Sequence, residues 1–129
     1  LTAVKADLFI LGGVTDHITP WKATYRSTKL FGSKDVTYVL SQSGHMQAIL
    51  NPPTNPKAKY FTQKKKGNLP DTADEWLQGT EEVKGSWWPL WAEWCQKRAG
   101  KKVAAPTEVG NSDYAPLDPA PGLYVIEEV

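Results

Sequence analysis

The first third of the chain consists of two apolar runs separated by a stretch with helical spacing. Residues 6–13, ADLFILGG, form a continuous apolar run closed by glycines, which is typical of a strand buried on both faces of a parallel sheet. Residues 35–40, DVTYVL, predict a second strand. Between them, Pro20 begins and Gly32 ends a predicted helix over residues 21–31. Strand, helix and strand in this succession predict a right-handed βαβ crossover.

The remaining two thirds predict shorter elements with long polar connections. A short helix is expected over residues 46–50, and residues 51–72, rich in Pro, Asn and Lys, predict an extended surface loop. Residues 101–129 carry four prolines and predict an extended tail along the surface, with a strand-like end at residues 123–129. Two further helices are predicted, each between a hydroxyl cap and a glycine stop, at residues 72–79 and 86–100.

Composition and charge exclude classes of function rather than select one. The 129 residues suit one modest domain. Lys and Arg number 15 against 14 Asp and Glu, so no strong field attracts nucleic acid or an anionic membrane, and the basic run at residues 64–66 predicts only a solvated loop. No apolar run reaches the roughly 18 residues of a membrane span, and no signal-peptide pattern opens the chain. Because the chain enters a strand-like run almost at once, we expect a piece of a longer protein.

The predicted helix over residues 86–100 holds the only cysteine and four of the six tryptophans. A single cysteine allows no disulfide framework and fits a reducing, cytoplasmic setting. Cys95 lies mid-helix among tryptophans, which predicts a buried, inert thiol. Trp87, Trp91 and Trp94 repeat at helical spacing and predict a face packed onto the core, with Trp88 off that face. The alternative is an exposed aromatic patch that contacts a partner.

One acid and one histidine follow the two predicted strands. Asp16 comes just after two glycines, and His45 comes just after a Ser-Gly pair. Reactive side chains of open α/β sheets gather beyond the carboxyl ends of the parallel strands, so we expect the carboxylate and the imidazole to meet there. Such a carboxylate holds one imidazole tautomer while the other ring nitrogen takes a proton. Gly44 is expected to let the backbone turn sharply so that His45 projects.

Structural interpretations of the same residues stay open. Thr15 or Asp16 is also placed to cap the helix that follows, and a histidine at a strand end often serves only as a local hydrogen-bonding group. A nucleophile is missing, because no G-x-S-x-G or G-x-C-x-G elbow occurs, and Ser41 and Ser43 lack that setting. On the residues alone, the chain offers an acid and a base without a nucleophile.

Several long strings, separated and in order, resemble one family. The chain is similar to the carboxyl-terminal part of the polyhydroxyalkanoate synthases, most of all to the class I poly(3-hydroxyalkanoate) polymerases. The resemblance covers essentially the whole chain, and its last string looks like the natural terminus of that family. The strings that carry it are GGVTDHITPWKATYRSTKLFG, VLSQSGHMQAILNPP, GSWWPLWAEW and GNSDYAPLDPAPGLYV.

The resemblance implies an α/β fold, the carboxyl-terminal portion of an α/β-hydrolase with parallel strands and crossover helices, incomplete as a domain. It implies that residues 1–100 belong to the catalytic domain and that residues 101–129 form the proline-rich tail. Asp16 falls on the catalytic acid of the family and His45 on its catalytic histidine. His17 matches the same string and is expected to be structural or to contact Asp16 and His45 without taking part in the reaction.

The resemblance also implies a reaction and partners. The family polymerises 3-hydroxyacyl groups from 3-hydroxyacyl-coenzyme A onto a growing polyester chain, using a cysteine nucleophile that is expected upstream of Leu1 in the rest of the synthase. No cofactor beyond the coenzyme A thioester substrate is expected. The setting is cytoplasmic, at the polyhydroxyalkanoate granule surface, and the whole enzyme is expected to form a homodimer. The 129-residue chain alone is expected to be inactive.

Two other functions stay open beside this one. The chain is alternatively a piece of another α/β-hydrolase, an esterase or lipase whose serine elbow lies upstream. A second alternative is a non-catalytic fragment that binds granules or a partner through its tryptophan helix and tail. Neither the chain length of the monomer nor whether Asp16 orients His45 or activates the substrate hydroxyl follows from the sequence.

Overall fold

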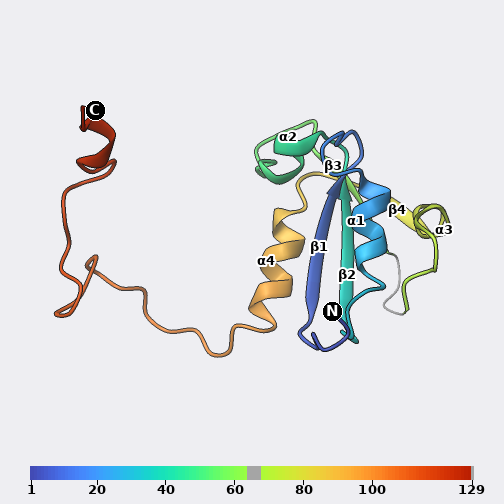
Figure 1. Ribbon diagram of the computed structural model, residues 1–129, viewed down its shortest axis with the longest axis horizontal. Helices are drawn as coiled ribbons and strands as arrows, with labels where there is room; N and C mark the ends of the chain where they lie inside the picture. Colours follow the sequence, from blue (N-terminus) through green and yellow to red (C-terminus); the bar gives the residue numbers. More distant parts are fainter. Residues whose placement is uncertain (64–67, 129) are drawn as a thin grey trace. The chain divides into compact units, whose positions relative to one another are not determined.

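A computed structural model describes residues 1–63 and 68–128, and it divides the chain into two compact units, Leu1–Arg98 and Ala99–Val129. The basic run at residues 64–66 lies outside the described residues. In the described part of the first unit, four strands form one sheet with the order β1-β2-β3-β4, and helices are interspersed along the chain (Figure 1). The elements are β1 (Leu8–Gly13), α1 (Trp21–Ser27), β2 (Val36–Ser41), α2 (His45–Ile49), β3 (Lys59–Gln63), α3 (Ala73–Gln78), β4 (Thr80–Lys84) and α4 (Trp88–Gln96).

The predicted strand-helix-strand unit is confirmed. β1 and β2 pair in parallel, with Leu8 opposite Val36 and Gly13 opposite Ser41, and α1 connects them. α1 ends at Ser27, earlier than predicted, because the chain continues in single turns rather than in α-helical bonds. Gly32 is required for a different reason: a side chain there would collide with the backbone carbonyl of Thr2.

The expected parallel strands are found only in β1 and β2, because β3 and β4 both run antiparallel to their neighbours and the sheet is mixed. β3 lies inside residues 51–72, which the composition had predicted to be a surface loop. It pairs with β2 through Leu40 opposite Phe61, and Tyr60 is buried. The flanking prolines and lysines hide this short strand in the sequence, and cross-strand pairing decides its conformation. β4, also not predicted, carries the charges that suit an edge strand.

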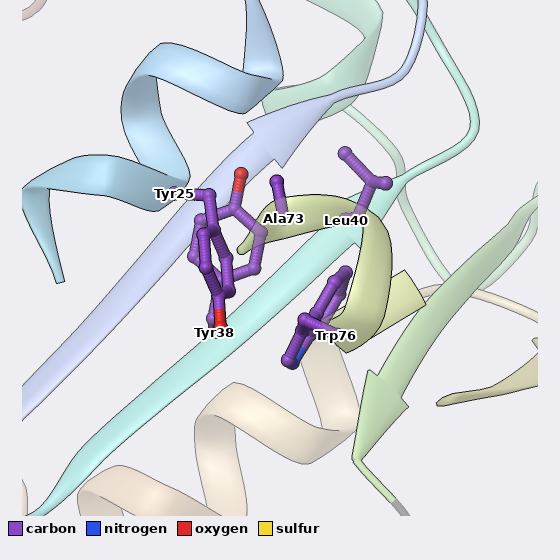
Figure 2. Packing of buried hydrophobic residues seen from close by; sticks show 5 residues of the cluster. All are labelled: Tyr25, Tyr38, Leu40, Ala73 and Trp76. Carbon is purple, nitrogen blue, oxygen red and sulfur yellow. The ribbon is translucent and has the colours of Figure 1, made fainter. Parts of the chain in front are cut away.

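The sheet buries side chains on both faces, and β2 contributes to each. Tyr38 and Leu40 face α1 and α3, where they form a cluster with Tyr25, Ala73 and Trp76 (Figure 2). The ring of Tyr38 meets the rings of Tyr25 and Trp76 edge to face, at 5.1 and 4.9 Å between centroids. Val39 points to the opposite face, toward α4. β1 is half-buried rather than fully buried over residues 8–11, because it lies at the edge of the described sheet.

The helix α3 forms as its sequence predicts. Thr72 Oγ1 accepts the Glu75 N–H, and the Glu75 carboxylate accepts the Thr72 N–H in return, which is a capping box. Gly79 follows the last helical residue, as expected. The placement of Trp76 against the sheet therefore rests on a locally specified helix start.

The predicted tryptophan face of α4 is only partly confirmed. Trp87 is buried, but Trp91 is 47% exposed, while Trp88 packs against the core cluster. α4 begins at Trp88, later than predicted, but Trp87 has helical backbone angles and its carbonyl accepts the Trp91 N–H at 3.1 Å. The two tryptophans therefore share a helical face that is buried at Trp87 and exposed at Trp91. Trp94 lies partly buried with its ring 5.8 Å from that of Phe9. The predicted cap residue, Ser86, accepts the Trp88 N–H at 3.0 Å. The first α-helical residue is Trp88, later than that cap had predicted.

The second unit, Ala99–Val129, is mostly exposed and irregular. Its one described helical turn is a 3₁₀ segment at Tyr124–Ile126, where the sequence predicted a strand. A strand forms only where a neighbouring strand can accept and donate its backbone hydrogen bonds. Among the residues that the structure describes, no strand pairs with this apolar run. No helix in the described ranges is long and apolar enough to cross a membrane.

Candidate functional site

The loops that leave β1 and β2 stay bonded to each other beyond the strand ends. Val14 N–H donates to the Ser41 carbonyl at 2.9 Å, and Thr15 N–H donates to the Ser43 carbonyl at 3.3 Å. These bonds extend the parallel pairing past Gly13. The two loops are therefore held side by side at the point where one delivers an acid and the other a histidine.

Asp16 and His45 meet at this edge of the sheet. His45 Nδ1 lies 2.8 Å from Asp16 Oδ2, and the Asp16 side chain is only 6% exposed whereas the imidazole is 37% exposed. A carboxylate only accepts hydrogen bonds, so it holds the tautomer in which Nδ1 carries the proton. No residue of the described chain bonds to Nε2. The more exposed imidazole is thus left with one nitrogen able to take a proton.

Three hydrogen-bond donors from its own loop bind the carboxylate of Asp16. Oδ1 accepts the N–H groups of Ile18 and Thr19, each at 2.9 Å, and Oδ2 accepts the Thr19 hydroxyl at 2.7 Å. The Thr19 N–H contributes most, and with the Thr19 hydroxyl, His45 and the Ile18 N–H it outweighs desolvation and holds the pKa of Asp16 far below its ordinary value. Asp16 is therefore an anion at neutral pH.

The helix-cap interpretation of Thr15 and Asp16 is wrong for α1. The residue that precedes α1 is Pro20, and no side chain caps this helix. Apart from the bond to His45, the bonds of Asp16 stay within its own turn and end at Thr19, before the helix begins. Asp16 thus stabilises a loop and faces His45 at the same time. The contribution of Thr19 was missed, although Asp followed by Thr three residues later is a pattern for such a side-chain-closed turn.

Two glycines flank the site, and only one is sterically required. A Cβ on Gly13 would lie 2.7 Å from the Ser43 carbonyl and 3.0 Å from the Ala48 Cβ, too close for any side chain. Gly44 has an ordinary φ of −81°, and a Cβ there would meet only Thr15 atoms at 3.6 Å or more. The expectation that Gly44 is needed for a sharp turn is therefore wrong. Gly13 allows the close approach of α2 to β1 instead.

The other predicted candidates take no part in this pair. His17 is exposed and has no described hydrogen bond, so its supporting role stays a prediction. Ser41 is buried at the end of β2 and accepts a long bond from Asn51. Cys95 is half-buried rather than buried, and it lies on α4 just before Arg98, which pairs with acids ahead of β1 and β2 at the opposite end of these strands.

No metal centre is indicated by the side chains that the structure describes, since no group of three His, Cys, Asp or Glu residues is arranged to hold an ion. What the arrangement does offer is an ionised acid and a partly exposed base. That combination serves proton transfer to or from a group brought to Nε2.

Comparisons with known proteins give a consistent answer. No family model matches the chain. The chain is 48% identical over 126 residues to poly(3-hydroxyalkanoate) polymerase 2 and 46% identical over 127 residues to polymerase 1, both of Ectopseudomonas oleovorans. It is 42% identical over 125 residues to the polymerase subunit PhaC of Cupriavidus necator. These matches cover 97–98% of the chain and 20–22% of each relative. The chain therefore belongs to the poly(3-hydroxyalkanoate) polymerase family, and it spans about a fifth of the length of the relatives it matches.

Proposed function

We propose that the chain is the carboxyl-terminal part of a poly(3-hydroxyalkanoate) polymerase and supplies the acid and the base of its acyl transfer. The observation that carries this proposal is the bond between His45 Nδ1 and Asp16 Oδ2, with the imidazole partly exposed. The relatives are enzymes by name, and the two residues lie where a shared strand edge brings them together. The polymerase is proposed to need no cofactor other than its coenzyme A thioester substrate.

The proposed reaction uses a cysteine from the rest of the polymerase. His45 Nε2 takes the proton of that thiol, and the thiolate attacks the carbonyl carbon of the 3-hydroxyacyl thioester. The carbon–sulfur bond to coenzyme A breaks, and coenzyme A leaves with the proton that His45 returns. The hydroxyl of the growing chain then gives its proton to His45 Nε2 and attacks the carbonyl carbon of the enzyme-bound acyl group. The carbon–sulfur bond to the cysteine breaks, and the proton returns from His45 to the released thiolate. Asp16 stays ionised throughout and stabilises the imidazolium that forms in each half-reaction.

Three features support an α/β-hydrolase setting for this chemistry. β1 and β2 form a parallel pair with a connecting helix, and each is followed by one member of the pair. The acid precedes the histidine in the chain, which is the order in α/β-hydrolases. Finally, no strand pairs with the outer edge of β1 among the described residues, which suits a sheet continued by other parts of the polymerase.

A second proposal concerns location and rests on the unit Ala99–Val129. Several of its apolar side chains are almost fully exposed, among them Val103, Leu117 and Tyr124, at 88%, 92% and 88%. Apolar groups so exposed favour contact with a hydrophobic surface. We assign this unit to the surface of the polyester granule in the cytoplasm. If the chain is instead a non-catalytic binding fragment, this contact is its whole function and His45 takes no part in catalysis.

The test is coenzyme A release from 3-hydroxybutyryl-coenzyme A by the whole polymerase. H45A should lower the rate by a hundredfold or more, on the order expected when a general base is removed. H17A is the matched control, since His17 is an exposed histidine next to Asp16, and it should stay within about tenfold of the wild type. Equal rates for H45A and the wild type would favour the binding fragment, and hydrolysis without polymer formation would favour an esterase.

A further inference from the structure

Three consecutive residues where the chain enters α4 hydrogen-bond to the last residues of α2 and to Asn51 just beyond it. Trp87 Nε1 donates to the Ala48 carbonyl at 2.8 Å, and Trp88 Nε1 donates to the Ile49 carbonyl at 2.9 Å. The Ser86 hydroxyl donates to the backbone carbonyl of Asn51. We call Ser86, Trp87 and Trp88 the indole clamp. Its three donors come from the side chains of the GSWWP string, which the proposed reaction does not use.

The helix that the indole clamp contacts, α2, is too short to be stable on its own. α2 has five residues, far below the length at which an isolated helix is stable, and its last carbonyls have no partners within the helix. His45 is its first residue and lies one turn before Ala48. A rotation or slide of α2 would therefore move the imidazole, while Asp16 stays fixed in the turn after β1.

The clamp is anchored on its own side. Trp87 is 8% exposed and belongs to the core cluster with Val39 and Tyr60, and its ring lies 6.0 Å from that of Phe9. Ser86 is buried and also accepts the Trp88 N–H. Across α2, the Ala48 Cβ lies within 3.0 Å of where a Gly13 side chain would stand. Ala48 is thus fixed between the end of β1 and an indole that the core keeps in place.

A buried amide joins the same assembly to β2. Asn51 is 1% exposed, and its Nδ2 donates to the Ser41 hydroxyl at the end of β2 at 3.4 Å. Its backbone carbonyl accepts a hydrogen bond from the Ser86 hydroxyl, and its Oδ1 accepts one from Asn55 Nδ2 at 2.9 Å. The end of α2 is therefore tied both to the strand that precedes His45 and to the clamp.

We propose that Trp87 and Trp88 are positioning residues for His45: by holding the carbonyls of Ala48 and Ile49 they set the orientation of α2 and thereby aim Nε2 at the thiol. This inference rests on the proposed function, because it assumes that His45 transfers a proton. It explains why two adjacent tryptophans with different exposure both donate to the same short helix.

The test replaces each indole by a smaller aromatic ring that lacks the N–H. In the whole polymerase, W87F and W88F should each lower kcat by about tenfold to a hundredfold, the range that a misaimed catalytic group produces, with KM unchanged. W91F is the control: Trp91 lies on the same helix and is 47% exposed, and its indole N–H has no described hydrogen bond, so kcat should stay within about twofold. If W87F does not fold, W88F decides, because Trp88 is less deeply buried.

Two outcomes would overturn the positioning role. If W87F and W88F match W91F in kcat while H45A in the same assay is inactive, the indoles do not aim His45 and the proposed function stands. If W87F or W88F raises KM as much as it lowers kcat, the clamp supports the fold generally and not the base. If H45A itself keeps the wild-type rate, the proposed function fails first, and the positioning role fails with it.

Discussion

The carboxylate of Asp16 binds two backbone N–H groups with Oδ1, while Oδ2 faces the Thr19 hydroxyl and His45. One side chain thereby fixes the loop and the imidazole tautomer together. The sequence predicted that Asp16 and His45 would meet, because both follow parallel strands. It could not show whether Asp16 caps the following helix or binds His45, since an Asp in that position can do either. The start of α1 at Trp21, too far along the chain for Asp16 to cap it, decides between the two.

We predict that D16N has a lower free energy of unfolding than the wild type at neutral pH, and that this difference becomes smaller in acid. The pKa of Asp16 is lowered in the folded state, so its contribution to the free energy of unfolding is present above the ordinary value of 3.8 and lost as the pH falls below it. Asn keeps an oxygen for the backbone bonds but carries no charge. Urea unfolding of both proteins at pH 7, 5, 4 and 3, followed by tryptophan fluorescence, should show a constant gap down to about pH 5 and a smaller one at pH 3. A gap that stays constant to pH 3 would contradict the lowered pKa.

Among the elements, α2 depends most on its surroundings. Its short length gives it little stability of its own, and it is held by the close approach to β1 at Gly13 and by the indole clamp. The helix at residues 46–50 was predicted from the sequence, but its start at His45 and its anchors were not. α3 was predicted fully because its capping box is local, whereas β3 and β4 depend on pairing between distant segments.

The two glycines near the pair make a matched test of this packing. G13A should strongly reduce both stability and polymerase activity, since its Cβ would meet the Ser43 carbonyl at 2.7 Å and push α2 away from β1. G44A should leave the melting temperature within about 2 °C, because its backbone is ordinary and its Cβ has room. Thermal melts and coenzyme A release of both variants check this. Equal effects of the two substitutions would show that Gly13 is not the tight contact.

For the molecule as a whole, the described strands form one four-stranded sheet, and the chain spans about a fifth of the length of the relatives it matches. An α/β architecture was predicted from the crossover and is confirmed at that level. The antiparallel half was not, because its strands are short and charged or flanked by proline. The sequence contains no nucleophile elbow, so the proposed function takes its thiol from elsewhere in the polymerase.

The central claim is that His45 transfers the proton, and chemical rescue tests it most directly. Coenzyme A release in a single turnover is measured for H45A of the whole polymerase with and without added imidazole. We predict that H45A is slower than the wild type by a hundredfold or more and that free imidazole restores part of the rate in proportion to its concentration, because it replaces the missing base in the space that the side chain leaves. A rate for H45A equal to that of the wild type, or a lost rate that imidazole does not restore while the variant remains folded, would contradict the claim.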